Sequence, residues 1–271
     1  MDFNAMFPDE ESCLKFLFKK RFGDSYPCPE CKHIKLYPVR GRKCYVCGNC
    51  GHHLYPMKGT IMENSTTPLL TWFMAIYEFH ISRAGQSAKE IERRFGVTYK
   101  TAWRMARLIR SLMRDEVKLS GRVEVDSTWV GGKRNSNKIV IFGMIERGKR
   151  GLAKFYVINN ESEAETLPLI LKHVEKGSTI YSDQGGAFHH LSKHGYIHKT
   201  INHSKKEYVR GDKHTCTIDG FWGRFKDSVL GTHRHISHKW AQGYIDEFCF
   251  RYNRNNDEDK IFEDLINNTA T

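Results

Sequence analysis

The stretch RVEVDSTWV, residues 122–130, is rich in β-branched and aromatic side chains, which is typical of a strand, and it carries an aspartate, Asp126. Three further runs of the same kind follow it and are separated from one another by turn residues. They are KIVIFGMI (138–145), AKFYVI (153–158) and STIYSD (178–183). The sequence therefore predicts four strands in this part of the chain.

Helices are predicted between and after these strands. The run ESEAETLPLILKHVEK (161–176) lies between the third and fourth strands, and residues 216–229 and 238–253 follow the fourth. Successive strands followed by helices predict an α/β domain. Its boundary with the preceding part of the chain is expected near residues 118–121, KLSG.

Two predicted helices precede that boundary, with a short turn between them. Residues 87–95 begin with Ser87 and Glu90, which are spaced as in a capping box, and Gly96 ends the helix. A helical pattern resumes over residues 98–117. This arrangement predicts a helix-turn-helix, whose second helix enters the major groove of DNA; the alternative is a three-helix bundle with a solvated basic face. The side chains presented to DNA would be those of Thr98, Tyr99, Lys100, Thr101 and Arg104.

A cysteine motif lies nearer the start of the chain. Cys28-Pro-Glu-Cys31 and Cys47-Gly-Asn-Cys50 are two C-x-x-C pairs with 15 residues between them, a stretch that fits a pair of strands. Four thiolates complete a closed tetrahedral site for one structural Zn²⁺, with no position left for a substrate. Disulfides are the alternative. Cys44 also forms a C-x-x-C pair with Cys47, but a glycine follows the pair of Cys47 and Cys50, as is usual in such ribbons.

Charge and composition favour a nucleic-acid partner. The 271 residues carry a formal net charge of +12 and the pI is near 9.3. A protein that neutralises phosphates needs such an excess, although a soluble basic protein without that role is the alternative. No apolar run approaches the roughly 18 residues that span a membrane, and the first residues do not resemble a signal peptide. We therefore expect no membrane association and an intracellular location with DNA, in the nucleus of a eukaryote or the cytoplasm and nucleoid of a bacterium.

Three aspartates are candidates for a catalytic centre. Asp126 and Asp183 lie in or just after predicted strands and would meet if those strands are adjacent, while Asp219 lies on a predicted helix. Lys226 follows Asp219 by seven residues and so shares its helical face. Phosphodiester cleavage uses two Mg²⁺ about 3.5–4 Å apart, and hard oxygen ligands from separate elements must converge on them. The alternative is that each aspartate separately is a turn residue or a helix cap.

The order of these motifs resembles that of a zinc-ribbon DDE transposase, the family of certain bacterial insertion sequences and of the eukaryotic Merlin DNA transposons. The resemblance covers roughly residues 25–255. The matching motifs are C-P-x-C … C-x-x-C, GT-x₇-PL-x-x-W-F, V-E-V-D-x-T-x-V-G-G-K, D-Q-x-x-A-F, H-T-x-T-I-D-G-F-W-x-x-x-K and E-F-x-F-R-Y-N-R. The family implies an RNase H-like fold, dependence on Mg²⁺ or Mn²⁺, recognition of terminal inverted repeats, and cleavage followed by strand transfer.

The resemblance also implies roles for individual residues. Asp126 and Asp183 match the first two catalytic aspartates, and Asp219 matches the third acid, which is more often glutamate in the family. Lys226 would contact phosphate near the active site. His214 would assist the metal site or contact DNA, with a packed or surface histidine as the alternative. Cys216 departs from the family, which often has Asn there.

Other residues in the matching motifs have plainer interpretations. Three aromatic residues flank catalytic positions and are expected in the core rather than as platforms for bases. They are Trp129, Phe221 and Trp222. Three polar residues of the last helix are interpreted either as a buried network that braces the catalytic helix or as DNA contacts. They are Glu247, Arg251 and Asn253.

The sequence thus predicts a DNA transposase that acts on double-stranded DNA, both terminal inverted repeats and target, as a homodimer or a larger homo-oligomer. The alternatives are a domesticated, non-catalytic DNA-binding regulator and a nuclease that does not integrate. The expected divisions are an N-terminal helix (1–25), a zinc ribbon (26–60), a helix-turn-helix domain (61–118), an RNase H-like catalytic domain (119–260) and a C-terminal tail (261–271).

Overall fold

The chain divides into two compact units in a computed structural model. The structure describes residues 2–131, 138–148, 151–183, 188, 190–201, 216–255, 257 and 260–269. The first unit comprises Met1–Ser82, Gln86–Leu112 and Asp257–Thr271, and the second comprises Arg83–Gly85 and Met113–Asn256. No helix in the described ranges is both long enough and apolar enough to cross a membrane.

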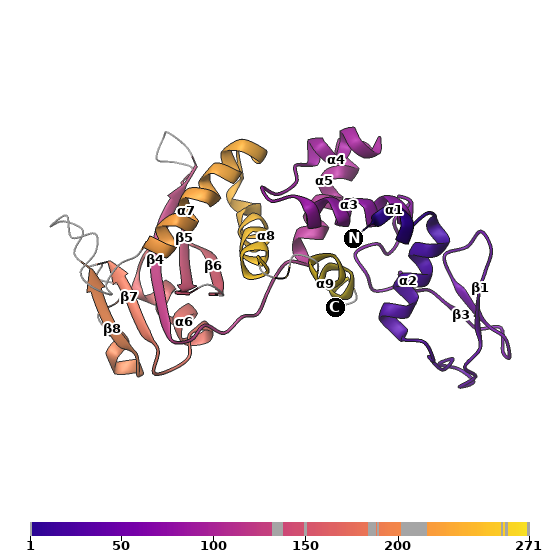
Figure 1. Ribbon diagram of the computed structural model, residues 1–271, viewed down its shortest axis with the longest axis horizontal. Helices are drawn as coiled ribbons and strands as arrows, with labels where there is room; N and C mark the ends of the chain where they lie inside the picture. Colours follow the sequence, from indigo (N-terminus) through magenta and orange to yellow (C-terminus); the bar gives the residue numbers. More distant parts are fainter. Residues whose placement is uncertain are drawn as a thin grey trace. The chain divides into compact units, whose positions relative to one another are not determined.

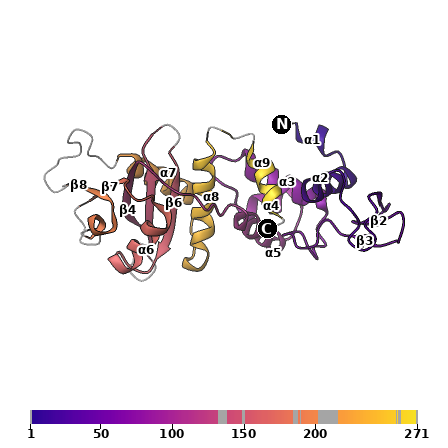
Figure 2. The same ribbon diagram turned by 90° about the horizontal axis from the view of Figure 1, so that it is seen from below.

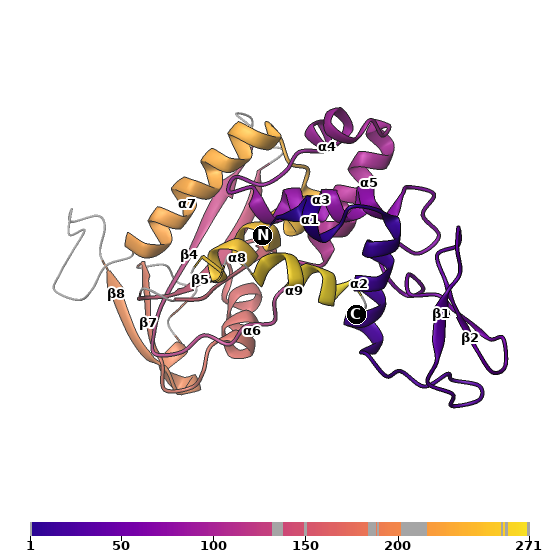
Figure 3. The same ribbon diagram turned by 45° about the vertical axis from the view of Figure 1, so that its right-hand side comes forward.

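A small antiparallel sheet lies in the first unit. Its strands are β1 (Leu36–Pro38), β2 (Tyr45–Cys47) and β3 (His53–Leu54), in the order β1-β2-β3. The first two strands confirm the pair predicted between the cysteine motifs. Tyr45 of β2 stacks on Phe18, with ring centroids 4.1 Å apart, so the sheet packs against the helix that carries Phe18 (Figure 3).

The rest of the first unit is helical. Its helices are α1 (Phe3–Met6), α2 (Glu10–Phe22), α3 (Leu69–Ile81), α4 (Ala88–Phe95), α5 (Tyr99–Ser111) and α9 (Ile261–Asn268). The end of the sequence was expected to be a tail, but residues 261–268 form α9, whose apolar side packs on α2 and α3 (Figure 2). Phe262 is fully buried and contacts the rings of Phe3, Phe7 and Phe73. The chain therefore returns to its first unit to complete an aromatic core.

Helices α4 and α5 are joined by a turn of three residues. The side chain of Ser87 accepts a hydrogen bond from the backbone N–H of Glu90 at 3.2 Å, which begins α4 as predicted. Gly96 ends it with a φ of 63°, a left-handed conformation that favours glycine. Thr98 then caps α5 through the backbone N–H of Thr101.

Helix α5 ends at Ser111, although the sequence pattern predicts a helix as far as residue 117. The backbone beyond it, from Met113, belongs to the second unit and bonds within that unit instead of continuing the helix. The carbonyl of Asp115 accepts a hydrogen bond from the Lys154 ammonium at 2.6 Å, and Leu119 forms a bridge with Val174. The boundary between the units accordingly falls a few residues before the expected one.

The second unit contains a five-stranded mixed sheet. Its strands are β4 (Arg122–Val130), β5 (Ile139–Glu146), β6 (Ala153–Ile158), β7 (Thr179–Asp183) and β8 (Ile197–Ile201), in the order β6-β5-β4-β7-β8 (Figure 1). Strands β4, β5 and β6 are antiparallel, whereas β7 is parallel to both β4 and β8. The first four strands in sequence were predicted. The edge strand β8 was not, because its five residues, IHKTI, have apolar side chains only at the two ends, with three polar residues between them.

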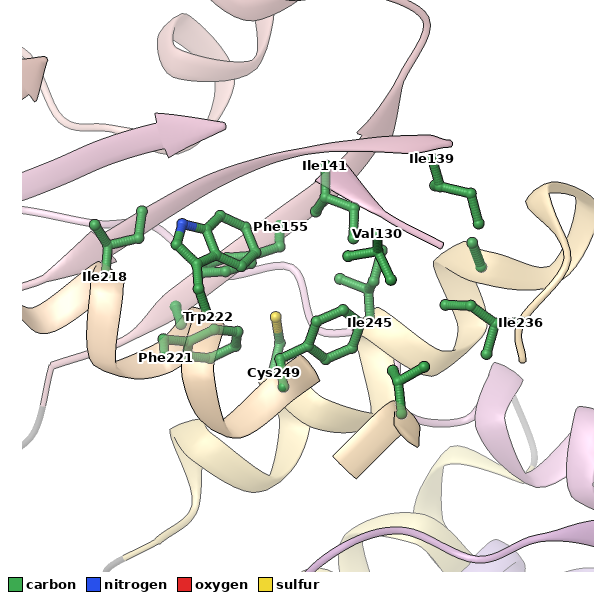
Figure 4. Packing of buried hydrophobic residues seen from close by; sticks show 14 of the residues in the cluster. Val130, Ile139, Ile141, Phe155, Ile218, Phe221, Trp222, Ile236, Ile245 and Cys249 are labelled. Atoms are coloured by element: carbon green, nitrogen blue, oxygen red, sulfur yellow. The ribbon is translucent and has the colours of Figure 1, made fainter. Parts of the chain in front are cut away.

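Helices cover both faces of this sheet. They are α6 (Glu163–His173), α7 (Cys216–Ser228) and α8 (Ala241–Asn253), together with short helical turns at Leu191–His194, Val229–His233 and His238–Trp240. One core cluster joins Val123, Val125 and Phe142 to α6. The other joins the opposite face to α7 and α8, where Phe221 and Trp222 point at Phe155 (Figure 4). The second unit is thus a three-layered α/β domain, which confirms the predicted mixed α/β class.

Candidate functional site

The four cysteines of the two C-x-x-C pairs converge in the first unit. Their sulfur atoms all lie within 4.8 Å of one another, with 3.7 Å between Cys28 and Cys50 and 3.5 Å between Cys31 and Cys47. Four sulfurs arranged tetrahedrally at about 2.3 Å from one zinc would be roughly 3.8 Å apart. The donor set and its spacing therefore fit a structural zinc ion, and Cys44 is not part of the cluster.

Backbone geometry explains why the two pairs converge. In each pair the backbone carbonyl of the first cysteine accepts a hydrogen bond from the backbone N–H four residues later. Lys32 donates to Cys28 at 2.9 Å, and Gly51 donates to Cys47 at 3.0 Å. Lys32 and Gly51 both have a positive φ, of 61° and 73°. Each pair is therefore the same tight turn, which directs two thiols to one point. The glycine after the second pair satisfies this backbone requirement.

The pKa values of two thiols in the cluster shift in opposite directions. A backbone hydrogen bond from His52 lowers the pKa of Cys50, but the contacts with the other cysteines and burial raise it to about 12. A hydrogen bond from the backbone of His33 is the main cause that lowers the pKa of the Cys31 thiol to about 6. A thiol with a lowered pKa forms the thiolate that zinc requires. Of the neighbouring histidines, His52 lies 3.9 Å from Glu30 and is not part of the four-cysteine group.

The aspartates of the second unit lie on one face of the large sheet. Strand β4 pairs in parallel with β7, and Glu124 is the partner of Tyr181. Asp126 and Asp183 are each two residues further along, so the same register brings them level with each other and on the same face. That face is the one that α7 covers, and α7 carries Asp219. Besides desolvation, the charges of Asp219 and Asp183 raise the pKa of Asp126, so each of these two carboxylates lies within electrostatic reach of Asp126.

Asp126 is held by a tryptophan from α7. The indole N–H of Trp222 donates a hydrogen bond to Oδ2 of Asp126 at 2.9 Å. A glycine on β5 makes room for it: Gly143 pairs with Asp126, and a Cβ there would come within 2.9 Å of the Trp222 ring. The predicted core position of Trp222 is confirmed, since only 5% of it is exposed. Its hydrogen bond to Asp126 was not foreseen, although a glycine inside a buried strand is a signal of close approach.

Burial dominates the electrostatics of Asp126. The pKa of its carboxyl is raised from 3.8 to about 6, mainly by desolvation and to a smaller extent by the charges of Asp219 and Asp183. The Trp222 hydrogen bond acts in the opposite direction because it stabilises the carboxylate. The Asp126 carboxyl therefore takes up a proton closer to neutral pH than an ordinary aspartate, since its pKa is about 6.

The remaining predicted catalytic residues have simple placements. Lys226 is half-buried on α7, two turns after Asp219. Cys216 is the exposed first residue of α7. His214 lies outside the described residues.

The aromatic residues near the catalytic positions and the polar residues of α8 have different surroundings. Phe221 is fully buried, as expected, but Trp129 was expected in the core and is 49% exposed. It lies one residue before the end of β4, and Lys138 lies over its ring at 5.9 Å. In α8, Glu247 pairs with Arg251 at 3.0 Å, and Asn253 exchanges two hydrogen bonds with the backbone of Ala153. Asn253 thus fixes the end of α8 to β6, whereas the pair of Glu247 and Arg251 lies within α8.

The predicted DNA-contacting residues lie at the start of α5. Thr98 and Thr101 bond to each other, hydroxyl to hydroxyl, at 3.0 Å, so the capping interaction uses both side chains. Tyr99 is 47% exposed and stacks with the Lys89 ammonium of α4 at 4.9 Å. Lys100 and Arg104 are exposed. The first turn of α5 thus presents cationic and aromatic groups to solvent.

The sequence pattern did not identify two residues near Asp126 with buried side chains, Glu124 and Arg147. Glu124 has no exposed surface, and it forms a 2.7 Å ion pair with Arg147. Its position two residues before Asp126 in a strand was the available signal, since both side chains must lie on the same face.

Comparison with known proteins adds family assignments to this geometry. A family model of a transposase zinc-ribbon domain matches residues 8–53, and one of an ISXO2-like transposase domain matches residues 118–253. No match was found among curated proteins.

One solved structure gives a weak likeness. It is the cryoEM structure of the simian T-cell lymphotropic virus intasome in complex with PP2A regulatory subunit B56 gamma, with 12% sequence identity and a TM-score of 0.33. The alignment covers 65% of this chain and 66% of that chain, slightly less than two thirds of its length. Similarity this low does not support an inference about function. The family matches are the informative ones. Half of the chain matches an ISXO2-like transposase domain, and a transposase zinc ribbon precedes it, so the chain belongs to the zinc-ribbon DDE transposases.

Proposed function

We propose that the chain is an active DNA transposase, which binds terminal inverted repeats and catalyses metal-dependent cleavage and strand transfer. One observation carries the proposal: Asp126 and Asp183 are level on adjacent parallel strands, under a helix that carries Asp219. Converging carboxylates repel one another, so the arrangement is hard to account for unless cations are bound there. A regulator that only binds DNA would have no use for it.

The sheet topology supports an RNase H-like fold for the second unit. Three antiparallel strands are followed by two that run parallel to the first, with helices on both faces. In this arrangement the acidic residues lie on the central strand β4 and its neighbour β7. The order of elements thus agrees with the fold that the family resemblance implies.

The three aspartates are the proposed ligands of Mg²⁺ or Mn²⁺. Their hard oxygen donors match what these ions require, and a cation bound beside Asp126 would lower the pKa that burial has raised. A bound divalent ion supplies Lewis acidity and an activated water or hydroxyl nucleophile. Trp222 orients Asp126, and Lys226 is proposed to bind phosphate along the same helix.

DNA recognition is assigned to the first unit. Helices α4 and α5, with their three-residue turn at Gly96, have the organisation of a helix-turn-helix. The proposed reading surface consists of Thr98, Tyr99, Lys100, Thr101 and Arg104. The whole chain has a net charge of +12, and its excess lysine and arginine side chains would contact DNA phosphates. Two transposon ends must be processed together, so we propose a homodimer or a larger homo-oligomer on DNA.

A cleavage and joining assay tests this function. Purified protein is incubated with labelled duplexes that carry the inverted repeats flanking the coding sequence, with unlabelled target DNA and Mg²⁺ or Mn²⁺. We expect cleavage at the repeat ends and labelled joined product. Binding without cleavage would identify a regulator, and cleavage without joined product would identify a nuclease; either result contradicts the proposal.

The pKa of Asp126 gives a pH prediction. Because the folded chain holds this proton more tightly than the unfolded chain, ionisation of Asp126 lowers stability as pH rises from about 4 to about 6. A cation at the site would offset this loss only where Asp126 is ionised. We therefore expect Mg²⁺ to raise the melting temperature of the second unit clearly at about pH 7.5 and much less at about pH 5. Calorimetry that found equal stabilisation at both values would contradict this assignment.

Replacing Trp222 with phenylalanine should shift the pH dependence of metal binding to higher pH. The variant keeps an aromatic ring in the core but removes the N–H that stabilises the Asp126 carboxylate, so the pKa of Asp126 rises further. The pH at which Mn²⁺ binding is half-maximal should increase, measured by electron paramagnetic resonance of free Mn²⁺. The matched control is Phe221→Leu on the same helix, which alters the core without touching Asp126. An unchanged midpoint in Trp222→Phe would show that the hydrogen bond does not tune Asp126.

A further inference from the structure

A second carboxylate lies on β4 beside the proposed metal ligands. Glu124 is two residues before Asp126 and faces the same helix, α7, yet it has no exposed surface. Both of its carboxylate oxygens are engaged by protein groups. The Nε of Arg147 donates to Oε1 at 2.7 Å, and the backbone N–H of Ile218 donates to Oε2 at 2.9 Å. Glu124 is therefore committed to contacts within the protein.

The arginine that pairs with Glu124 is itself fixed. Its side chain is only 7% exposed, and its guanidinium lies over the ring of Tyr181, 3.6 Å from the ring centroid. The backbone N–H of Arg147 also donates to the carbonyl of Arg122 at 2.9 Å, which ties it to the start of β4. A buried ion pair is costly unless its geometry is good and its other hydrogen-bonding groups are satisfied. This pair has a stacked guanidinium and a second hydrogen bond to the carboxylate.

The Ile218 contact lies in the first turn of α7. The first N–H groups of a helix have no partner within it, and the partial positive charge there favours a carboxylate. Glu124 satisfies one of these groups at the residue immediately before Asp219. The contact therefore sets the position of the backbone that carries Asp219.

A second contact further along α7 is matched to the first. Glu124 and Asp126 are about 7 Å apart along β4, and Ile218 and Trp222 are about 6 Å apart along α7. Glu124 accepts a hydrogen bond from the backbone N–H of Ile218, while Asp126 accepts one from the indole N–H of Trp222. The two carboxylates hold the helix alongside the strand at two points, with Asp219 between them.

We propose that Glu124, held by Arg147, is a positioning residue that anchors the first turn of α7 and thereby sets Asp219 against Asp126, and that it is not itself a metal ligand. This inference rests on the proposed metal-dependent function. Glu124 and Asp126 share a strand and a face but have different tasks: one fixes the helix, and the other binds the cation.

Three variants of the full zinc-loaded chain test the proposal. Glu124→Ala removes the anchor, and Glu124→Gln keeps an oxygen that accepts from Ile218. Lys154→Met is the matched control, because Lys154 and Asp246 form another buried pair of the second unit, with side chains 2% and 9% exposed. Each variant is assayed for the Mn²⁺ concentration at half-saturation, for hydrogen exchange of the Ile218 amide, and for melting temperature.

Glu124→Ala should raise the Mn²⁺ half-saturation about tenfold or more, as loss of a residue that orients a metal ligand typically does. It should also accelerate exchange of the Ile218 amide. Glu124→Gln should stay within about threefold of wild type in Mn²⁺ binding and keep the amide protected. The control should lower the melting temperature while leaving Mn²⁺ binding and Ile218 exchange unchanged.

Two results would overturn the inference. If Glu124→Ala behaves like the control in both Mn²⁺ binding and exchange, the residue is merely structural. If Glu124→Gln loses Mn²⁺ as fully as Glu124→Ala while Ile218 stays protected, Glu124 is a metal ligand. Failure of the proposed function would look different: wild type and Asp126→Asn would then bind Mn²⁺ equally, and the exchange of Ile218 would still decide whether Glu124 anchors α7.

Discussion

Replacing Asp126 with asparagine is expected to lower the rate of metal-dependent cleavage at the inverted repeats by about a thousandfold or more. The change keeps the shape of the side chain and an oxygen that accepts from Trp222, but it removes the negative charge that holds the cation. Metal ions contribute several kcal/mol to transition-state stabilisation, and about 4 kcal/mol corresponds to a thousandfold. Binding of the same DNA should remain within about twofold, because the proposed contacts lie on α5.

The matched control is Asp227→Asn. Asp227 is an exposed aspartate of the same helix as Asp219, eight residues further along, so it tests whether loss of any acid on α7 reduces cleavage. It should cleave at nearly the wild-type rate. Gel-shift titration and single-turnover cleavage, measured on the same preparations, separate the two activities. If Asp126→Asn lost DNA binding in parallel with cleavage, the division of labour between the two units would be wrong.

Loss of one zinc ligand should have the second large effect. In Cys28→Ser the four-thiolate site is broken, and zinc content should fall from about one to near zero per chain. The sheet β1-β2-β3 is small, so we expect it to fold only with the metal and amide protection over residues 26–56 to be lost. Affinity for the inverted repeats should fall as well, since the ribbon belongs to the unit proposed to bind DNA.

Cys44→Ala provides the control for this experiment. Cys44 is buried close in sequence to the ligands, but its sulfur is outside the four-cysteine cluster. It should keep one zinc per chain, as measured by atomic absorption, with only modest loss of stability. Zinc loss in Cys44→Ala with retention in Cys28→Ser would assign the site to the competing C-x-x-C pair of Cys44 and Cys47.

The sequence was most informative where a local requirement produces a visible pattern. Paired cysteines indicated a zinc ribbon, and β-branched runs indicated β4, β5, β6 and β7. The sequence predicted that Asp126 and Asp183 lie close together only on the condition that β4 and β7 are adjacent. Strand order results from packing between segments far apart in the chain, and no local pattern records it.

The parts that were missed depend on contacts at long range. Helix α5 ends early because Asp115 and Leu119, which follow it, bond to Lys154 and Val174 within the second unit. Trp222 looked like a core aromatic and is one, but its hydrogen bond to Asp126 spans 96 residues. Glu124 likewise reaches a backbone N–H 94 residues away. Such roles become visible only when the fold brings the partners together.

Anomalous diffraction from crystals of the zinc-loaded chain soaked in Mn²⁺ tests the central claim most directly. The account predicts manganese density at ligand distance from the carboxylates of Asp126, Asp183 and Asp219, with none on Glu124, alongside zinc at the four cysteines. Manganese bound elsewhere, or none at these three aspartates in a folded chain, would contradict a metal-dependent transposase site on this face of the sheet.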